Sequence, residues 1–198
     1  NNHKIGKHAL KGEFKEAVME YLCGPGEINE ESAKAREELK ESGDFQKALE
    51  TFPMHLGYEK SMLNHLIGTP TDYIGALRNL PKKLRWMFVH AYQGYIFNLA
   101  LSQYIKGGEI REELPLVGYG SKPDSITAGI LEAEDIKLED FKVPAMPEMT
   151  SEGIMRKAVI KFSDFEIIDF KEEESNLWVR FSLPPGAYAT VLLREIMK

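Results

Sequence analysis

The opening of the chain concentrates basic side chains on a protein that is acidic overall. Within "NNHKIGKHALKGEF" lie His3, Lys4, Lys7, His8 and Lys11, whereas the formal net charge of the whole chain is −6. Basic side chains at this density are typical of phosphate contacts, which position a nucleic acid without reading its sequence. A frayed and solvated terminus would produce the same pattern. The residues alone leave these two interpretations open.

A second candidate is the segment "HAYQGYIFN", which combines aromatic rings with hydrogen-bonding tips. Its members are Tyr92, Gln93, Tyr95, Phe97 and Asn98. Such side chains are what a base-stacking surface needs. Aromatic residues at helical spacing are more commonly core residues, so the residues by themselves favour a packing role.

The usual catalytic motifs are not found. The five histidines are scattered and lack the spacing of a metal site. The single cysteine, Cys23, forms no internal disulfide and resembles a small core residue more than a nucleophile. The segment "GYGSKPDS" lacks the spacing of a phosphate-binding loop. From these motifs alone we expect no metal site, and no active site can be identified.

Composition limits the class of protein. Of 198 residues, 43% are hydrophobic and 28% charged, as in folded proteins. An anionic partner has to meet a local basic patch, because the net charge is negative. No apolar run is long enough for a membrane span, and no signal peptide is visible.

The lone cysteine favours a reducing compartment, the cytoplasm. The first residue is Asn, so we expect a processed or truncated piece.

The elements that must position these residues change type along the chain. Helices are predicted at 12–22, 29–42, 44–52, 58–68, 72–80 and 81–106. On the long helix one face carries Leu84, Phe88, Ala91, Tyr95, Asn98 and Ser102. After residue 108 the pattern favours strands and loops, with one helical turn at 138–141 and strands at 158–170 and 177–183. The predicted fold class is α+β.

The chain ends in "LWVRFSLPPGAYATVLLREIMK", which does not read as a disposable tail. An alternating strand, a sharp turn and an amphipathic helix follow one another. Gly186 follows two prolines, so we expect it to need a conformation, or a closeness to a neighbour, that a side chain forbids.

Together these segments resemble the TruD family of tRNA pseudouridine synthases. The likeness runs through "NNHKIGKHALKGEFKEAVMEYL", "FVHAYQGYIFN", "PEMTSEGIMRK" and "FSLPPGAYATVLLREIMK", in the family's order, and is closest to the archaeal and eukaryotic branches. One small departure is Gly94, where the family favours Ser.

The resemblance implies a partial pseudouridine-synthase catalytic domain, with a mixed sheet and helices, interrupted by a TruD-type insertion domain. The expected division is 1–56 in the catalytic domain, 57–170 in the insertion domain, and 171–198 as the closing strand and helix. The family's nucleophilic Asp and a Phe-Gly-x-Gln-Arg-type motif lie upstream of this segment. The chain is therefore expected to be the later part of a longer enzyme, with no catalytic residue of its own and no activity alone.

The resemblance also implies a cofactor-free isomerisation of a D-arm uridine of tRNA, at position thirteen. The expected partners are tRNA and the upstream part of the same enzyme, with no membrane. Expected to line the substrate pocket are Gly186, Tyr188 and Thr190. Thr190 stands where other pseudouridine synthases have an Arg that pairs with the catalytic Asp. Expected to contact RNA are Lys4, Lys7, Lys11, Gln93, Asn98 and Arg194.

Two other interpretations remain open at this point. One is an RNA-binding module without catalysis. The other is a helical interaction protein, which the net charge allows but which leaves the C-terminal segment unexplained.

Overall fold

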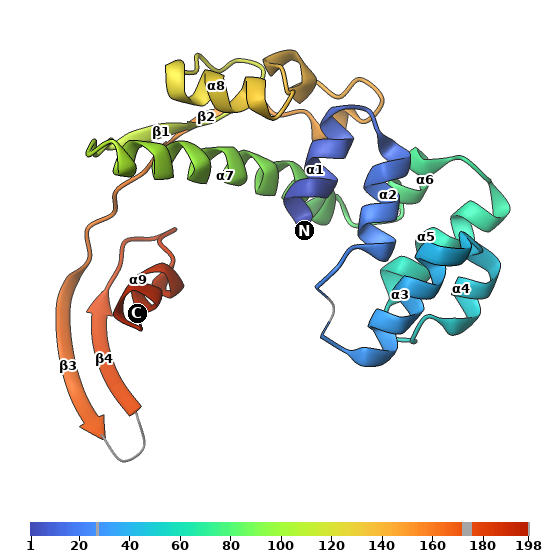
Figure 1. The fold of residues 1–198 in the computed structure, drawn as a ribbon, viewed down its shortest axis with the longest axis horizontal. Coiled ribbons are helices and arrows are strands. Elements are labelled where there is room, and N and C mark those ends of the chain that lie inside the picture. The colour runs from blue at the N-terminus through green and yellow to red at the C-terminus, as the bar shows by residue number, and fades with distance from the viewer. Residues whose placement is uncertain (27, 172–175, 198) are drawn as a thin grey trace. The chain divides into compact units, whose positions relative to one another are not determined.

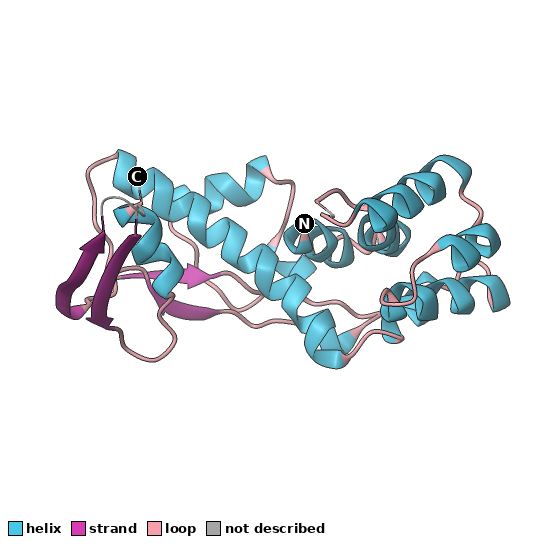
Figure 2. Cartoon of the chain, turned by 90° about the horizontal axis from the view of Figure 1, so that it is seen from below, coloured by secondary structure: helices cyan, strands magenta, loops and turns pink. Residues whose placement is uncertain are grey.

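The computed structural model describes residues 1–26, 28–171 and 176–197 and contains two compact units. The first, here called the helical unit, comprises Asn1–Glu109 and Leu114–Arg156. The second, the hairpin unit, comprises Ile110–Glu113 and Lys157–Lys198. Each unit is described by itself. Helices and antiparallel strands coexist, which confirms the α+β class (Figures 1 and 2).

The helical unit begins with seven helices joined by short connections. They are α1 (Asn2–Leu10), α2 (Phe14–Cys23), α3 (Glu30–Ser42), α4 (Phe45–Thr51), α5 (Gly57–Gly68), α6 (Tyr73–Arg78) and α7 (Lys82–Lys106). The predicted helices agree with α2 to α7 within a few residues. Helix α1 was not predicted, because two glycines and a terminus weaken its local signal.

Side-chain caps and a glycine explain several helix ends. The carboxylate of Asp44 accepts a hydrogen bond from the Lys47 backbone N–H at 3.0 Å, which caps α4. Asp72 caps α6 in the same way through the Gly75 N–H at 2.8 Å. Helix α3 ends at Gly43, whose φ of 64° is left-handed.

Close contact between α1 and α7 organises the helical unit. Figure 1 shows α1 beside α7. A Cβ atom built on Gly6 would lie 2.1 Å from the Phe88 carbonyl oxygen, so only glycine permits this approach.

The buried face of α7 differs from the predicted face. Of the predicted stripe only Phe88 is buried, whereas Leu84, Ala91 and Tyr95 are half-buried. The buried residues of α7 are Phe88, Val89, Tyr92, Gln93, Ile96, Phe97, Ala100 and Tyr104. Because α7 packs against both α1 and α8, two neighbours rather than one periodic stripe decide its burial.

The expectation of strands and loops after residue 108 was wrong for one segment, α8 (Ser125–Ala133). Its N-terminus is capped by Asp124, which accepts from the Thr127 N–H at 2.8 Å. Ile130 and Leu131 bury the inner face of the helix. Gly129 and the β-branched residues obscured the helical pattern.

The remaining elements of this part are short. Strands β1 (Glu113–Leu116) and β2 (Ile154–Lys157) form a two-stranded sheet. Two 3-10 turns follow α8 along the chain, η1 (Leu138–Phe141) and η2 (Pro147–Met149). The turn predicted at 138–141 is thereby confirmed.

The hairpin unit contains β3 (Ser163–Lys171), β4 (Asn176–Ser182) and α9 (Ala189–Ile196). The two strands pair antiparallel, with Ile167 opposite Val179 and Phe170 opposite Leu177. Figures 1 and 2 show α9 beside the hairpin. The charged segment "KEEESN" between the two strands lies largely outside the described residues. The alternating strand and the terminal helix are confirmed.

The compact units do not follow the expected domain division. Since β3 pairs with β4, a boundary after residue 170 would separate two paired strands. The expected boundary at residue 57 falls inside the helical unit. The division into catalytic and insertion domains stays a prediction. Among the described residues, no helix combines the length and the hydropathy of a membrane span.

Candidate functional site

A carboxylate at the end of α8 joins the basic first helix to the aromatic residues of α7. The Lys7 ammonium donates to Glu134 Oε2 at 2.7 Å. The hydroxyls of Tyr92 and Tyr95 donate to the two oxygens of the same carboxylate, each at 3.4 Å. Residues from α1 and from the aromatic segment, far apart in the sequence, therefore meet at one acidic group.

The environment of Glu134 favours its charged form. Burial disfavours the carboxylate, but the hydrogen bond and charge of Lys7, with the bonds from the two tyrosines, outweigh burial and lower the pKa of Glu134. The pKa of Tyr92 is raised, first by burial and then by the adjacent Glu134 charge. Tyr92 and Tyr95 thus stay protonated donors at neutral pH.

The other basic residues of α1 are distributed around this junction. The His3 ring stacks on Tyr95, with centroids 4.8 Å apart. Burial and then the nearby charge of Lys4 lower the pKa of His3. Lys11 donates to Asp135 at 2.6 Å, and Lys4 is exposed. Phosphate contacts by Lys7 and Lys11 would compete with carboxylates already bound to them.

Gln93, one of the residues expected to contact RNA, is buried in the helical unit. Its side chain is only 2% exposed, and its amide nitrogen donates to the Val117 carbonyl at 2.6 Å and to Ser151 Oγ at 2.8 Å. Its amide oxygen faces His90 Nδ1 at 2.8 Å. The polar atoms of Gln93 therefore hold α7 to the segments around 117 and 151. The expected contact of Gln93 with RNA stays a prediction.

The other predicted site residues lie at the surface of their units. Asn98 is exposed on α7, and Thr190 and Arg194 are exposed on α9. Gly186 has a φ of 84°, and nothing lies within 4 Å of a Cβ built on it. The predicted special conformation is confirmed, and its cause is the left-handed backbone rather than a close neighbour.

Tyr188 is the N-cap residue of α9 and is 64% exposed. The hairpin unit by itself therefore does not enclose the Tyr188 ring. The assignment of Gly186, Tyr188 and Thr190 to a substrate pocket stays a prediction.

A cationic surface at the start of α7 was missed by the sequence analysis. Residues 73–108 contain no Asp or Glu, but they contain five Lys or Arg residues. Four of these five lie within residues 78–85. The signal in the sequence is the absence of Asp and Glu over this long segment, and a search for runs of consecutive basic residues does not detect it.

Cys23 is half-buried, and burial raises the pKa of its thiol to about 11. The thiol stays protonated at neutral pH, which agrees with a packing role. Within the described ranges, no cluster of three or more His, Cys, Asp or Glu side chains is arranged to hold a metal ion.

Comparison with known proteins adds a family. The family model described as "tRNA pseudouridine synthase D (TruD)" matches residues 1–116 and 103–196. A probable tRNA pseudouridine synthase D of Methanosarcina acetivorans is 34% identical over 99% of this chain and 56% of that protein. A relative with the same description from Methanopyrus kandleri is 35% identical over 98% of this chain and 53% of that protein.

A solved structure agrees with these relatives. The crystal structure of the putative tRNA pseudouridine synthase D from Methanosarcina mazei has a TM-score of 0.86 and is 31% identical. The match covers 99% of this chain and 57% of that one. The chain thus spans little more than half the length of the relatives that it matches.

Proposed function

Because this chain belongs to the tRNA pseudouridine synthase D (TruD) family, we propose that it forms part of an enzyme that isomerises uridine to pseudouridine in tRNA. The observation that carries the proposal is the family match along nearly the whole chain. By resemblance to the family, the target is the D-arm uridine at position thirteen, and the reaction takes place in the cytoplasm without a cofactor.

In this proposal the chemistry is shared between this chain and a segment outside it. The nucleophilic Asp belongs to that segment, since the relatives are nearly twice as long as the matched region. The target uridine is flipped out of the RNA. The Asp carboxylate attacks the nucleoside, and the uracil detaches, rotates and rejoins the ribose through carbon. Catalysis then depends on holding the detached base in a desolvated pocket.

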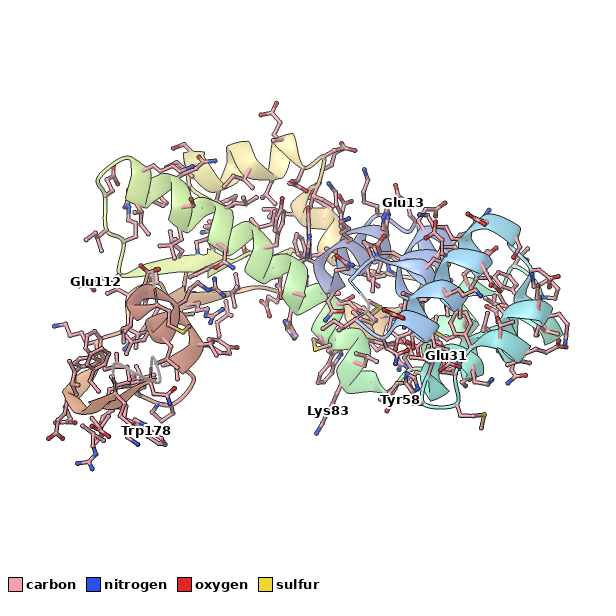
Figure 3. The ribbon with its side chains drawn as sticks, turned by 60° about the horizontal axis from the view of Figure 1, so that its bottom comes forward. Glu13, Glu31, Tyr58, Lys83, Glu112 and Trp178 are labelled. Atoms are coloured by element: carbon pink, nitrogen blue, oxygen red, sulfur yellow. The ribbon has the colours of Figure 1, made fainter. Side chains whose placement is uncertain are left out.

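The hairpin unit supports the idea of a shared catalytic sheet. None of its described residues is buried, although both strands carry large apolar side chains. Trp178 is 63% exposed and projects from the hairpin (Figure 3). A two-stranded hairpin is marginally stable alone, and exposed apolar surface of this kind normally meets a partner. We assign that partner to the segment that holds the Asp, so that β3, β4 and α9 complete its sheet.

Within this arrangement the terminal turn supplies part of the uridine pocket. Gly186 allows the left-handed turn that presents Tyr188 at the start of α9. The Tyr188 ring is the apolar wall of the pocket, and Thr190 lies two residues further along, in the first turn of α9. Lys4, Asn98 and Arg194 are exposed and contact RNA, with Lys7 and Lys11 available where a phosphate displaces their carboxylate partners.

The test compares this chain with the protein as its gene encodes it. Pseudouridine is detected in tRNA by primer extension after carbodiimide treatment. We expect a new stop with the encoded protein and none with the 198-residue chain alone. Turnover by the isolated chain would refute the missing nucleophile. Binding of tRNA by the encoded protein without any turnover would instead favour the RNA-binding module.

A second experiment tests the pocket assignment in the encoded protein. We expect Tyr188→Leu to lower the rate of pseudouridine formation at saturating tRNA while leaving the melting temperature nearly unchanged. The reverse result, with normal turnover and a lowered melting temperature, would make Tyr188 a packing residue.

A further inference from the structure

A cavity of about 400 Å³ lies where the start of α7 meets η2. Lys82, Trp86, Val89 and His90 line it from α7, and residues 147–151 line it from the other side. All of these residues belong to the helical unit. None of them belongs to the proposed uridine pocket, which lies in the hairpin unit.

Trp86 is held in a defined orientation at this cavity while remaining 42% exposed. Its indole Nε1–H donates to the Glu148 carbonyl oxygen, which ties the edge of the ring to η2. The Lys82 ammonium lies 4.7 Å from the ring centroid. An exposed cation–π contact is weak and readily exchanged. A planar base can therefore take the place of the ammonium on the ring, and the lysine is then free to meet a phosphate.

His90 lines the same cavity, and its hydrogen bond with Gln93 indicates its tautomer. The Val117 carbonyl accepts from the amide nitrogen of Gln93, so the atom that faces His90 Nδ1 is the amide oxygen. Since that oxygen only accepts, Nδ1 carries the proton, and Nε2 of the neutral imidazole is an acceptor. An acceptor beside an aromatic face matches the N–H groups on the edge of a nucleobase.

Charge at the rim of the cavity favours an anion. The carboxylate of Glu148 is paired with Arg78 at 3.1 Å and lies 3.9 Å from Arg85. Lys82 and Lys83 add two further exposed cations, and Lys83 projects away from α7 (Figure 3). Since residues 73–108 contain no Asp or Glu, this end of α7 is positive on an acidic protein.

We propose that this cavity binds an unpaired nucleobase of the RNA substrate, stacked on Trp86, with the neighbouring phosphates at Lys82 and Lys83. The inference rests on the proposed function, which supplies RNA as the ligand. It adds a second contact site, in the helical unit, that positions the RNA while the target uridine is in the hairpin unit's pocket. Trp86 is thus a positioning residue and not a catalytic one.

The main test replaces Trp86 in the protein as its gene encodes it and measures tRNA binding and turnover. Trp86→Leu should weaken tRNA binding about 5- to 150-fold, the range of one stacked base, and raise KM with kcat unchanged. Trp86→Phe should retain most of the affinity. Binding of tRNA should also quench the fluorescence of Trp86. This contribution is measured as the difference in quenching between the unsubstituted protein and Trp86→Phe.

Charge is tested with a matched pair on the same helix. Lys83→Glu should weaken binding for every tRNA sequence and flatten its salt dependence, because fewer counterions are released. Lys106→Glu, an exposed lysine at the far end of α7, should change both quantities less.

The outcomes separate the two proposals. Normal KM in Trp86→Leu, or no Trp86 quenching on tRNA binding, would overturn the stacking site even if turnover is normal. If the protein without any substitution neither binds tRNA nor forms pseudouridine in it, the proposed function itself is refuted. Should Trp86→Leu fail to fold, the quenching measurement and Trp86→Phe still decide.

Discussion

Replacing Gly6 by alanine should separate α1 from α7. In a helix interior the change alone would favour folding by about 1 kcal/mol, because alanine has the higher helix propensity. Here the new Cβ would lie 2.1 Å from the Phe88 carbonyl oxygen and 2.7 Å from its carbon. Both are backbone atoms of a long helix, so no flexible side-chain end can move aside. Helix α1 would have to retreat.

The size of the effect follows from these opposing terms. Overpacking a close contact costs about 1–3 kcal/mol, and a clash with backbone belongs at the upper end. After the gain in helix propensity, we expect the free energy of unfolding to fall by about 2 kcal/mol. Ile5, Ala9 and Leu10 are buried on the same helix and would lose contacts as it moves.

Gly94 provides the matched control. It lies inside α7, and nothing is within 4 Å of a Cβ built on it. Gly94→Ala should therefore raise the free energy of unfolding by about 0.5–1 kcal/mol. The two substitutions are chemically identical and differ only in what the methyl group meets.

Urea unfolding followed by far-ultraviolet circular dichroism measures both variants, since most helices lie in the helical unit. The expected difference between them is about 3 kcal/mol, the sum of the two effects. Equal stabilisation by both substitutions would refute the close approach of α1 to α7 at Gly6.

Three further predictions concern charge and backbone. Arg36→Met should lower the free energy of unfolding by about 3–5 kcal/mol, because Glu59, 2.7 Å from Arg36 and nearly buried with it, would lose its partner. Adding Glu59→Met should restore much of this loss, as measured by urea unfolding. If the double variant is no more stable than Arg36→Met, the charges of the pair are not the cause. The folded-state pKa of Glu134 is lowered, so the carboxylate contributes its full stabilisation above the ordinary pKa of 4.5, and this stabilisation is lost as pH falls below that value. Glu134→Gln should therefore flatten the loss of stability in acid. An unchanged pH profile of stability would exclude the Lys7–Glu134 contact as the source of that loss. Gly186→Ala should cost about 1–2 kcal/mol in the encoded protein, because a side chain is strained at a φ of 84°, and an unchanged melting temperature would contradict that backbone conformation.

Local signals in the sequence determined much of the secondary structure. Asp44 marked the start of a helix and Gly43 the end of the preceding one, because capping involves residues only a few positions apart. The alternation around Leu177 predicted β4, and the two prolines before Gly186 predicted its unusual conformation. The order of the segments was sufficient to predict the family.

The tertiary structure decided which residues are available to act. Lys7 and Glu134 are 127 positions apart, and no local pattern indicates that they form an ion pair. Gln93 looked like a binding residue in the sequence, yet it is buried because backbone and side-chain acceptors from 117 and 151 meet it there. The Trp86 cavity depends on η2, about sixty residues further along the chain. Helix caps and strand alternation are set by neighbours in sequence, whereas burial and pairing are set by elements that only folding brings together.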